Sequence, residues 1–103
     1  MNPSAWLVTG GKTFVDKVFI SHLYALRAQK KRNDGSHLVS LYATQEEEAE
    51  FVVHVGDENE QYANTSGPRG AALNEALRYA NQFLPYGPVQ VYELIRIPVP
   101  LND

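Results

Sequence analysis

The chain contains no cysteine in its 103 residues. This absence excludes disulfides, thiolate catalysis and cysteine-based zinc sites, and it fits a reducing compartment. No apolar run approaches the roughly 20 residues that a helix needs to span a bilayer, and residues 1–6 do not read as an export signal. We therefore expect a cytoplasmic protein without a membrane association, folded as a single α+β domain over residues 1–103.

Lysine and arginine are absent between Asn33 and Pro68. That stretch has a formal charge of −8, whereas the rest of the chain carries +5. Clustered charge of one sign can steer a charged partner. We regard a run of four glutamates as a candidate acidic surface that binds a partner, with a solvated surface as the plainer alternative. These residues are Glu46, Glu47, Glu48 and Glu50.

Patterns for nucleotide and metal sites are incomplete. Residues 9–14, TGGKTF, resemble the end of a phosphate-binding loop, but Trp6 stands where the loop needs its first glycine. The three histidines form no metal-ligand pair with short spacing, and they are His22, His37 and His54. Residues 57–62 lack the glycine and an oxygen ligand of a calcium loop. We therefore predict no cofactor and no metal.

Catalytic and nucleic-acid motifs are absent too. No serine lies in a G-x-S-x-G turn, so we predict no catalytic residue and no enzyme. The basic cluster in residues 27–32 is small, and residues 50–55 lack the basic and second aromatic positions of an RNA-binding strand. Nucleic acid is therefore an unlikely partner.

A glycine-containing loop precedes the clearest helix. Ser66 and Gly67 lie in this loop and Arg69 follows it. Such a loop at a helix N-terminus, with an arginine beside it, predicts a possible anion-binding site. The alternative is that Ser66 only caps the helix.

Periodicity predicts a helix in residues 67–85 and a strand in residues 89–97. Ala71, Leu73, Leu77 and Ala80 recur at helical spacing, and β-branched and aromatic residues then follow a glycine turn. Residues 5–9 and 50–56 are further candidate strands.

The first half repeats this plan. Ala25-Leu26-Arg27 matches Ala76-Leu77-Arg78, and Leu41-Tyr42 matches Val91-Tyr92, at offsets of about 50 residues. Residues 12–20 allow two interpretations. Thr13 and Asp16 form a capping box that starts the helix early, or Gly10-Gly11 is a hairpin turn, residues 12–19 form a strand and Ser21 caps a shorter helix. The β-prone residues 18–20 favour the hairpin.

These elements predict a two-layer α+β sandwich. We expect a four- or five-stranded sheet with both helices on one face, in a ferredoxin-like arrangement with an internal βαβ repeat. The other face would be wet or covered by a partner. Tyrosine is favoured at interfaces, and the candidate interface residues are Tyr42, Tyr92 and Leu94.

Trp6-Leu7-Val8-Thr9, a helix with Ala25-Leu26-Arg27 and the segment Leu38 to Ala43 resemble parts of small accessory proteins of phages and prophages. In these proteins a Pro-Leu-Tyr-Ala strand often follows a short helix, and Ser40 stands here at the proline position. The resemblance covers about the first 43 residues. It implies a phage-type binding protein and transfers no site residues.

The sequence thus favours a non-enzymatic module that binds a protein partner, with a second copy of itself as the expected one. An acidic inhibitor that mimics nucleic acid is one alternative, and its expected determinant is the run of glutamates. A small enzyme or anion-binding domain is the other.

Overall fold

The structure is a computed structural model that describes residues 2–11, 15–56 and 60–94. Its elements follow the chain as two successive groups of two strands, a helix and a strand. The first group is β1 (Ala5–Thr9), β2 (Val15–Phe19), α1 (His22–Arg32) and β3 (His37–Leu41). The second is β4 (Glu48–Val55), β5 (Glu60–Pro68), α2 (Arg69–Phe83) with the short 3₁₀ helix η1 (Leu84–Tyr86), and β6 (Val89–Leu94).

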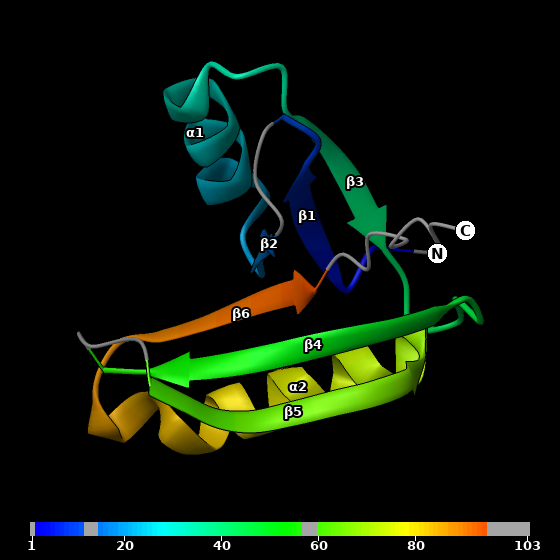
Figure 1. Cartoon of the computed structure of the whole chain (residues 1–103), viewed down its shortest axis with the longest axis vertical. Helices are drawn as coiled ribbons and strands as arrows, with labels where there is room; N and C mark the ends of the chain where they lie inside the picture. The colour runs from blue at the N-terminus through cyan, green and yellow to red at the C-terminus, as the bar shows by residue number, and fades with distance from the viewer. Residues whose placement is uncertain (1, 12–14, 57–59, 95–103) are drawn as a thin grey trace, which may run out of the picture.

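The six strands of the described residues form one antiparallel sheet in the order β3-β1-β2-β6-β4-β5. Each half is therefore a ββαβ unit in which the last strand lies beside the first, and the pairing of β2 with β6 joins the halves. The sheet is strongly twisted, so that β4, β5 and β6 run across the view of Figure 1 while β1 and β3 run steeply.

The α+β class is right, but the predicted ferredoxin-like sheet of four or five strands is wrong. The sheet has six strands in a different order, and the repeated unit is ββαβ rather than βαβ. The unexpected strand is β5, whose sequence EQYANTSGP is polar and ends in glycine and proline. It is a strand because it pairs with β4 from Glu48 to Val55, a tertiary effect that local propensity does not report.

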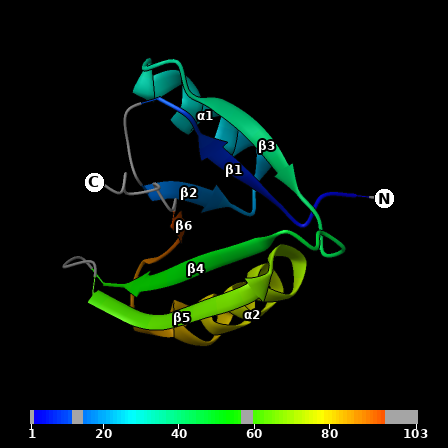
Figure 2. The same ribbon diagram turned by 45° about the vertical axis from the view of Figure 1, so that its right-hand side comes forward.

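The helices cover opposite faces of the sheet, not one face as predicted. Neighbouring residues of a strand point to opposite faces. In β1 the ring of Trp6 contacts His22 of α1, with 5.1 Å between ring centroids, whereas Leu7 joins the core cluster with Leu73 of α2. The strands of the second unit run antiparallel to the corresponding strands of the first, so right-handed connections in both units place the helices on opposite faces. Figure 2 shows α1 beside β1 and β3, and α2 beside β5.

Of the two interpretations of residues 12–20, the hairpin is confirmed for the described part. β2 pairs with β1, and residues 12–14 lie outside the described residues. Ser21 caps α1, because its hydroxyl accepts a hydrogen bond from the Tyr24 amide at 3.4 Å. The helix ends at Asn33, which adopts the left-handed conformation with φ of 48°.

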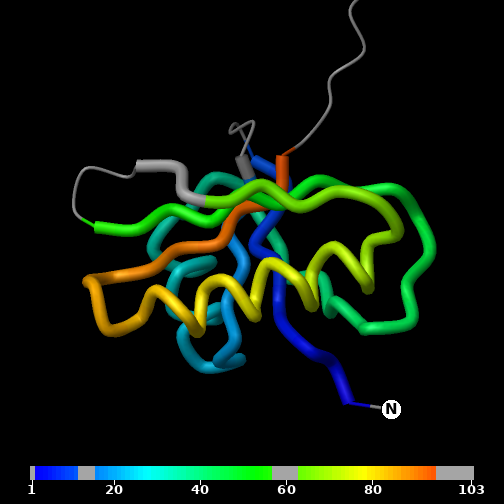
Figure 3. The backbone as a smooth tube through the Cα atoms, turned by 90° about the horizontal axis from the view of Figure 1, so that it is seen from below, coloured from blue at the N-terminus to red at the C-terminus, as the bar shows by residue number. Residues whose placement is uncertain are grey.

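The second helix begins at Arg69 and is capped by backbone rather than by Ser66. Pro68 holds the N-cap position, and no side chain caps the helix there. The amides of Arg69 and Gly70 instead donate to the carbonyls of Glu47 and Gln45, at 2.6 and 2.8 Å. These bonds tie the start of α2 to the segment before β4. Figure 3 shows α2 running along β4 and β5.

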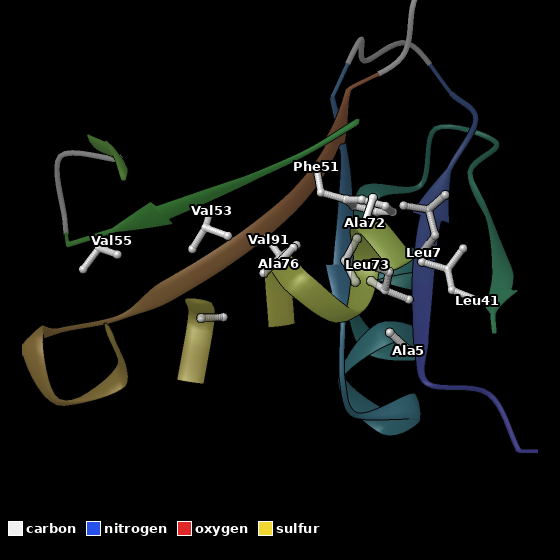
Figure 4. Close-up of a cluster of buried hydrophobic side chains, with 12 residues drawn as sticks. Ala5, Leu7, Leu41, Phe51, Val53, Val55, Ala72, Leu73, Ala76 and Val91 are labelled. Carbon is white, nitrogen blue, oxygen red and sulfur yellow. The ribbon is translucent and has the colours of Figure 1, made fainter. Parts of the chain in front are cut away.

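The core lies between α2 and the sheet face beneath it (Figure 4). One transverse row of residues on this face is entirely apolar. It takes one residue from each strand, in the order of the sheet from β3 to β5. Its members are Val39, Leu7, Val18, Val91, Val53 and Ala63. Phe51, Leu73 and Leu41 are fully buried around it. Burial of such side chains stabilises the fold by about 1.5–3 kcal/mol each.

Among the described residues, none of the helices combines the length and the apolar character that crossing a bilayer requires.

Candidate functional site

The next transverse row on the α2 face is mostly polar. Strand pairing and one side-chain hydrogen bond align its members from β3 to β5. They are His37, Thr9, Asp16, Glu93, Phe51 and Thr65. In the neighbouring apolar row the residues on β2 and β6 are both valines. In this row the residues on β2 and β6 are both acids.

Those two acids, Asp16 and Glu93, are both buried. Asp16 is 2% exposed and Glu93 is 6% exposed. Their Cα atoms are direct partners, so both carboxylates lie on one face within the short spacing of a cross-strand pair. Burial raises the pKa of both groups above their ordinary values, and the charge of Asp16 raises the pKa of Glu93 further.

Arg69 at the start of α2 partly balances this charge. Its guanidinium donates to the Glu93 carboxylate in an ion pair whose side chains are 22% and 8% exposed. The Arg69 Nε atom also lies 4.0 Å from the Glu47 carboxylate. The pairing lowers the pKa of Glu93, but burial has the larger effect.

Asp16 has weaker support. One carboxylate oxygen, Oδ2, accepts a hydrogen bond from the Thr9 hydroxyl. The other, Oδ1, is buried and has no hydrogen-bond partner among the described residues. The Arg32 guanidinium attracts Asp16, but it donates its hydrogen bonds to the carbonyls of Val8 and Gly10 and to Asp34.

A cavity of about 660 Å³ opens over this row. We call it the acid-lined pocket. Its described lining contains five carboxylates, one arginine and an apolar part formed by Leu7, Val39, Ala49 and Leu94. The charged residues are Asp16, Glu47, Glu48, Glu50, Glu93 and Arg69.

A second cavity, of about 590 Å³, lies between the start of α1 and the end of α2. We call it the apolar groove. Ile20, Tyr24 and Leu84 line it and remain 60%, 60% and 58% exposed. Leu23 and Tyr86, which flank them in the chain, are 55% and 77% exposed. All the large hydrophobic side chains described as exposed thus belong to residues 20–24 or to residues 84–86.

Lys17 is the charged residue of the groove. Its ammonium lies 5.3 Å from the centroid of the Phe19 ring, and burial lowers the pKa of Lys17. The ring therefore offers the partly desolvated cation a favourable contact.

The structure brings most of the predicted acidic residues together. Glu47, Glu48 and Glu50 line the acid-lined pocket, whereas Glu46 is exposed outside its lining. Their role in binding a partner stays a prediction.

The predicted anion site is divided. Ser66 and Arg69 line the acid-lined pocket, but Gly67 does not. The Arg69 guanidinium is occupied by carboxylates, and the first amides of α2 by carbonyls. Anion binding stays a prediction, in a place whose lining is mostly acidic.

The predicted interface residues do not meet at the apolar groove. Tyr92 and Leu94 alternate with Glu93 on β6 and are half-buried, and Leu94, at the end of the strand, lines the acid-lined pocket. Tyr42 is half-buried just after β3. The Tyr92 hydroxyl donates to the Gln90 side chain, its ring contacts His54, and burial raises its pKa. Their role in an interface stays a prediction.

The described residues contain no group of three or more potential metal ligands. His22 contacts Trp6 on β1, and His54 contacts Tyr92 on β6. His37 belongs to the polar row and is exposed. The three histidines therefore lie on different elements and have different neighbours.

Sequence reasoning missed the central pair and the groove. Glu93 alternates with Val89 and Val91, so its position among inward-facing valines was a usable signal. Asp16 could be assigned only after residues 15–19 were known to be a strand. The groove depends on the juxtaposition of residues more than 50 positions apart, which no local pattern reports.

No family model, curated protein or solved structure matches the chain. The resemblance to phage accessory proteins therefore stays a prediction.

Proposed function

We propose that the protein is a non-enzymatic binding module that associates with a second copy of itself through the apolar groove. The observation that carries this proposal is the concentration of exposed apolar surface. Five large hydrophobic side chains are each more than half exposed, and they belong to the segments 20–24 and 84–86. Three of them, Ile20, Tyr24 and Leu84, line the apolar groove together, and exposed apolar surface gathered in this way is typical of interaction sites.

The shape of this surface suits a symmetric pair. Leu84 lines the apolar groove, and Tyr86, the most exposed of the five, stands two residues further along η1. In a two-fold dimer each surface meets its own copy, so a projecting side chain of one protomer enters the groove of the other. Tyrosine is well suited to this position because it offers a large ring with one polar tip.

The charges around the groove favour a pair of this kind. Its described lining contains Lys17 but no carboxylate, and the Lys17 ammonium contacts the Phe19 ring. Association through the groove therefore buries mainly apolar surface and does not bring acidic residues of two copies together. Apolar burial is the dominant favourable contribution to most protein association.

Sedimentation equilibrium over a wide concentration range tests the proposal. We expect a reversible dimer, and we expect Tyr24→Asp and Leu84→Asp each to weaken it at least tenfold because each places a charge in the contact. Asn74→Asp adds the same charge at an exposed position of α2 outside the groove, and it should leave the dimer unchanged.

Two outcomes contradict the proposal. One is a wild-type mass of a single chain at several hundred micromolar. The other is a dimer that tolerates both groove substitutions as well as it tolerates Asn74→Asp, because the contact then lies elsewhere.

A further inference from the structure

Among its described lining residues, the acid-lined pocket carries more negative than positive charge. Asp16, Glu47, Glu48 and Glu93 line it with one described cation, Arg69, whose guanidinium is already paired with Glu93 and lies near Glu47. Surface acids are ordinarily balanced by water and salt. Here, however, Asp16 and Glu93 are withdrawn from water where β2 pairs with β6, and uncompensated buried charge is costly.

A second, independent observation points to a ligand. Asp16 is 2% exposed and lines the pocket, and its Oδ1 atom has no hydrogen-bond partner among the described residues. Buried polar atoms in folded proteins are nearly always hydrogen-bonded. Asp16 lines the cavity, although this oxygen itself is out of reach of water, so a donor from outside the chain can satisfy it when the carboxylate turns toward the cavity.

None of the described groups around Asp16 donates to this oxygen. Thr9 on β1 donates to the other oxygen, and Glu93 on β6 offers only like charge. Arg69 on α2 is committed to Glu93, and Arg32 on α1 is committed to backbone carbonyls and Asp34. His37 on β3 attracts Asp16 electrostatically without a hydrogen bond among those described.

We propose that the acid-lined pocket binds a small organic cation through a primary ammonium group. The Asp16 carboxylate turns its unpartnered oxygen toward the pocket and accepts a hydrogen bond from the ammonium, which lies between Asp16 and Glu93. The hydrocarbon part of the ligand rests on Leu7 and Val39. A primary ammonium has three donors, which suits two neighbouring carboxylates.

The size and composition of the pocket support an organic ion over a metal. Its volume of about 660 Å³ lies within the range of small-molecule pockets. The described residues contain no cluster of three potential metal ligands. The apolar part at Leu7 and Val39 adds a surface that a hydrated metal ion does not use, whereas an alkylammonium does.

Calorimetry with butylammonium as the probe tests the proposal on the full chain, with butanol, butyrate, inorganic phosphate and Mg²⁺ as comparison probes. We expect butylammonium to bind at least tenfold more tightly than each of the others. Amide resonances of residues that line the pocket should shift, including those of Thr9, Asp16 and Glu93.

Two variants separate the pocket from general charge. Asp16→Asn keeps the shape and removes the charge, and it should weaken butylammonium binding at least tenfold. Glu75→Gln removes an exposed carboxylate of α2 outside the pocket and should leave the affinity within about twofold, because exposed charges are screened.

A third readout needs no variant. The ammonium requires ionised carboxylates, so the affinity for butylammonium should rise with pH through the acidic range. Binding should also release protons, and calorimetry in buffers of different ionisation enthalpy measures their number. This readout decides the question even if Asp16→Asn does not fold.

The proposal is overturned by the absence of butylammonium binding at about 10 mM, where even millimolar affinity is detectable. Butanol binding equally well also overturns it, as does tighter binding of phosphate or Mg²⁺. These results are distinct from those that decide dimer formation, since the pocket and the groove share no lining residue.

Discussion

The Cα atoms of Asp16 and Glu93 are direct partners in the pairing of β2 with β6, the pairing that joins the two ββαβ units. Like charges directly opposite in a sheet repel each other, and burial increases the cost. Asp16 and Glu93 nevertheless lie opposite each other where β2 pairs with β6, whereas the neighbouring row of the same pairing places Val18 opposite Val91. This arrangement has consequences for stability that can be measured.

Stability should fall as pH rises through the weakly acidic range. Burial raises the folded-state pKa of Asp16 and of Glu93 above the ordinary values of 3.8 and 4.5. Between the ordinary and the raised pKa the folded state holds more protons than the unfolded state, so the free energy of unfolding decreases with increasing pH. Each unit of upward shift corresponds to about 1.4 kcal/mol.

Urea denaturation of the wild type and of Asp16→Asn from pH 4 to pH 8 measures this effect. The variant should lose less stability across that range, because its amide does not ionise. Asp34 contributes with the opposite sign and at lower pH, since its hydrogen bonds lower its pKa below 3.8. Parallel profiles for the two proteins would contradict the prediction.

Arg69→Met should destabilise the fold by about 2–3 kcal/mol, because it leaves the Glu93 carboxylate buried without its cation. The cost is smaller than for a fully buried ion pair because Arg69 is partly exposed. Adding Glu93→Leu should recover most of the loss. Arg78→Met removes an exposed arginine of the same helix and should cost less than about 0.5 kcal/mol. Equal losses for Arg69→Met and Arg78→Met in urea denaturation would show that the pair is not buried as described.

Gly70→Ala should destabilise the protein although alanine favours helices by about 1 kcal/mol. A Cβ atom at position 70 would overlap the backbone carbonyl of Ala43, and overpacking costs about 1–3 kcal/mol or more. Asn74→Ala, at an exposed position of the same helix, should stabilise slightly. Thermal unfolding distinguishes the signs, and a raised melting temperature for Gly70→Ala would mean that α2 does not approach Ala43 closely.

Asn33→Ala should cost about 1 kcal/mol, because Asn33 ends α1 in the left-handed conformation that alanine adopts poorly. Asn33→Gly should be neutral or slightly stabilising, since glycine is the usual residue at this position. Comparison of the two variants by urea denaturation isolates the backbone effect. The reverse order of stability would contradict the described end of α1.

The local elements were largely predictable from the sequence. The second helix, the strand after it and the Ser21 cap each have a local signal that operates over a few residues. The strand order was not predictable, because β5 is polar and exists through its partner β4. Without β5 the second half was interpreted as βαβ, and the wrong arrangement of helices followed.

The candidate site was only partly predictable for a related reason. Glu47, Glu48 and Glu50 were visible as a run, but their neighbours across the pocket come from β2 and β6. The burial of Asp16 depends on a strand pairing that links residues 16 and 93. Charge patterns along the chain therefore indicated acidity without indicating the pocket.

Carbon-detected NMR titration of the Asp16 and Glu93 carboxyl groups tests the central claim most directly, namely that the fold holds two acids together in a buried pair. We predict that both carboxyl groups titrate above their ordinary pKa values, and that the midpoint of Asp16 falls when butylammonium is present. Midpoints at or below the ordinary values, unchanged by butylammonium, would contradict the account.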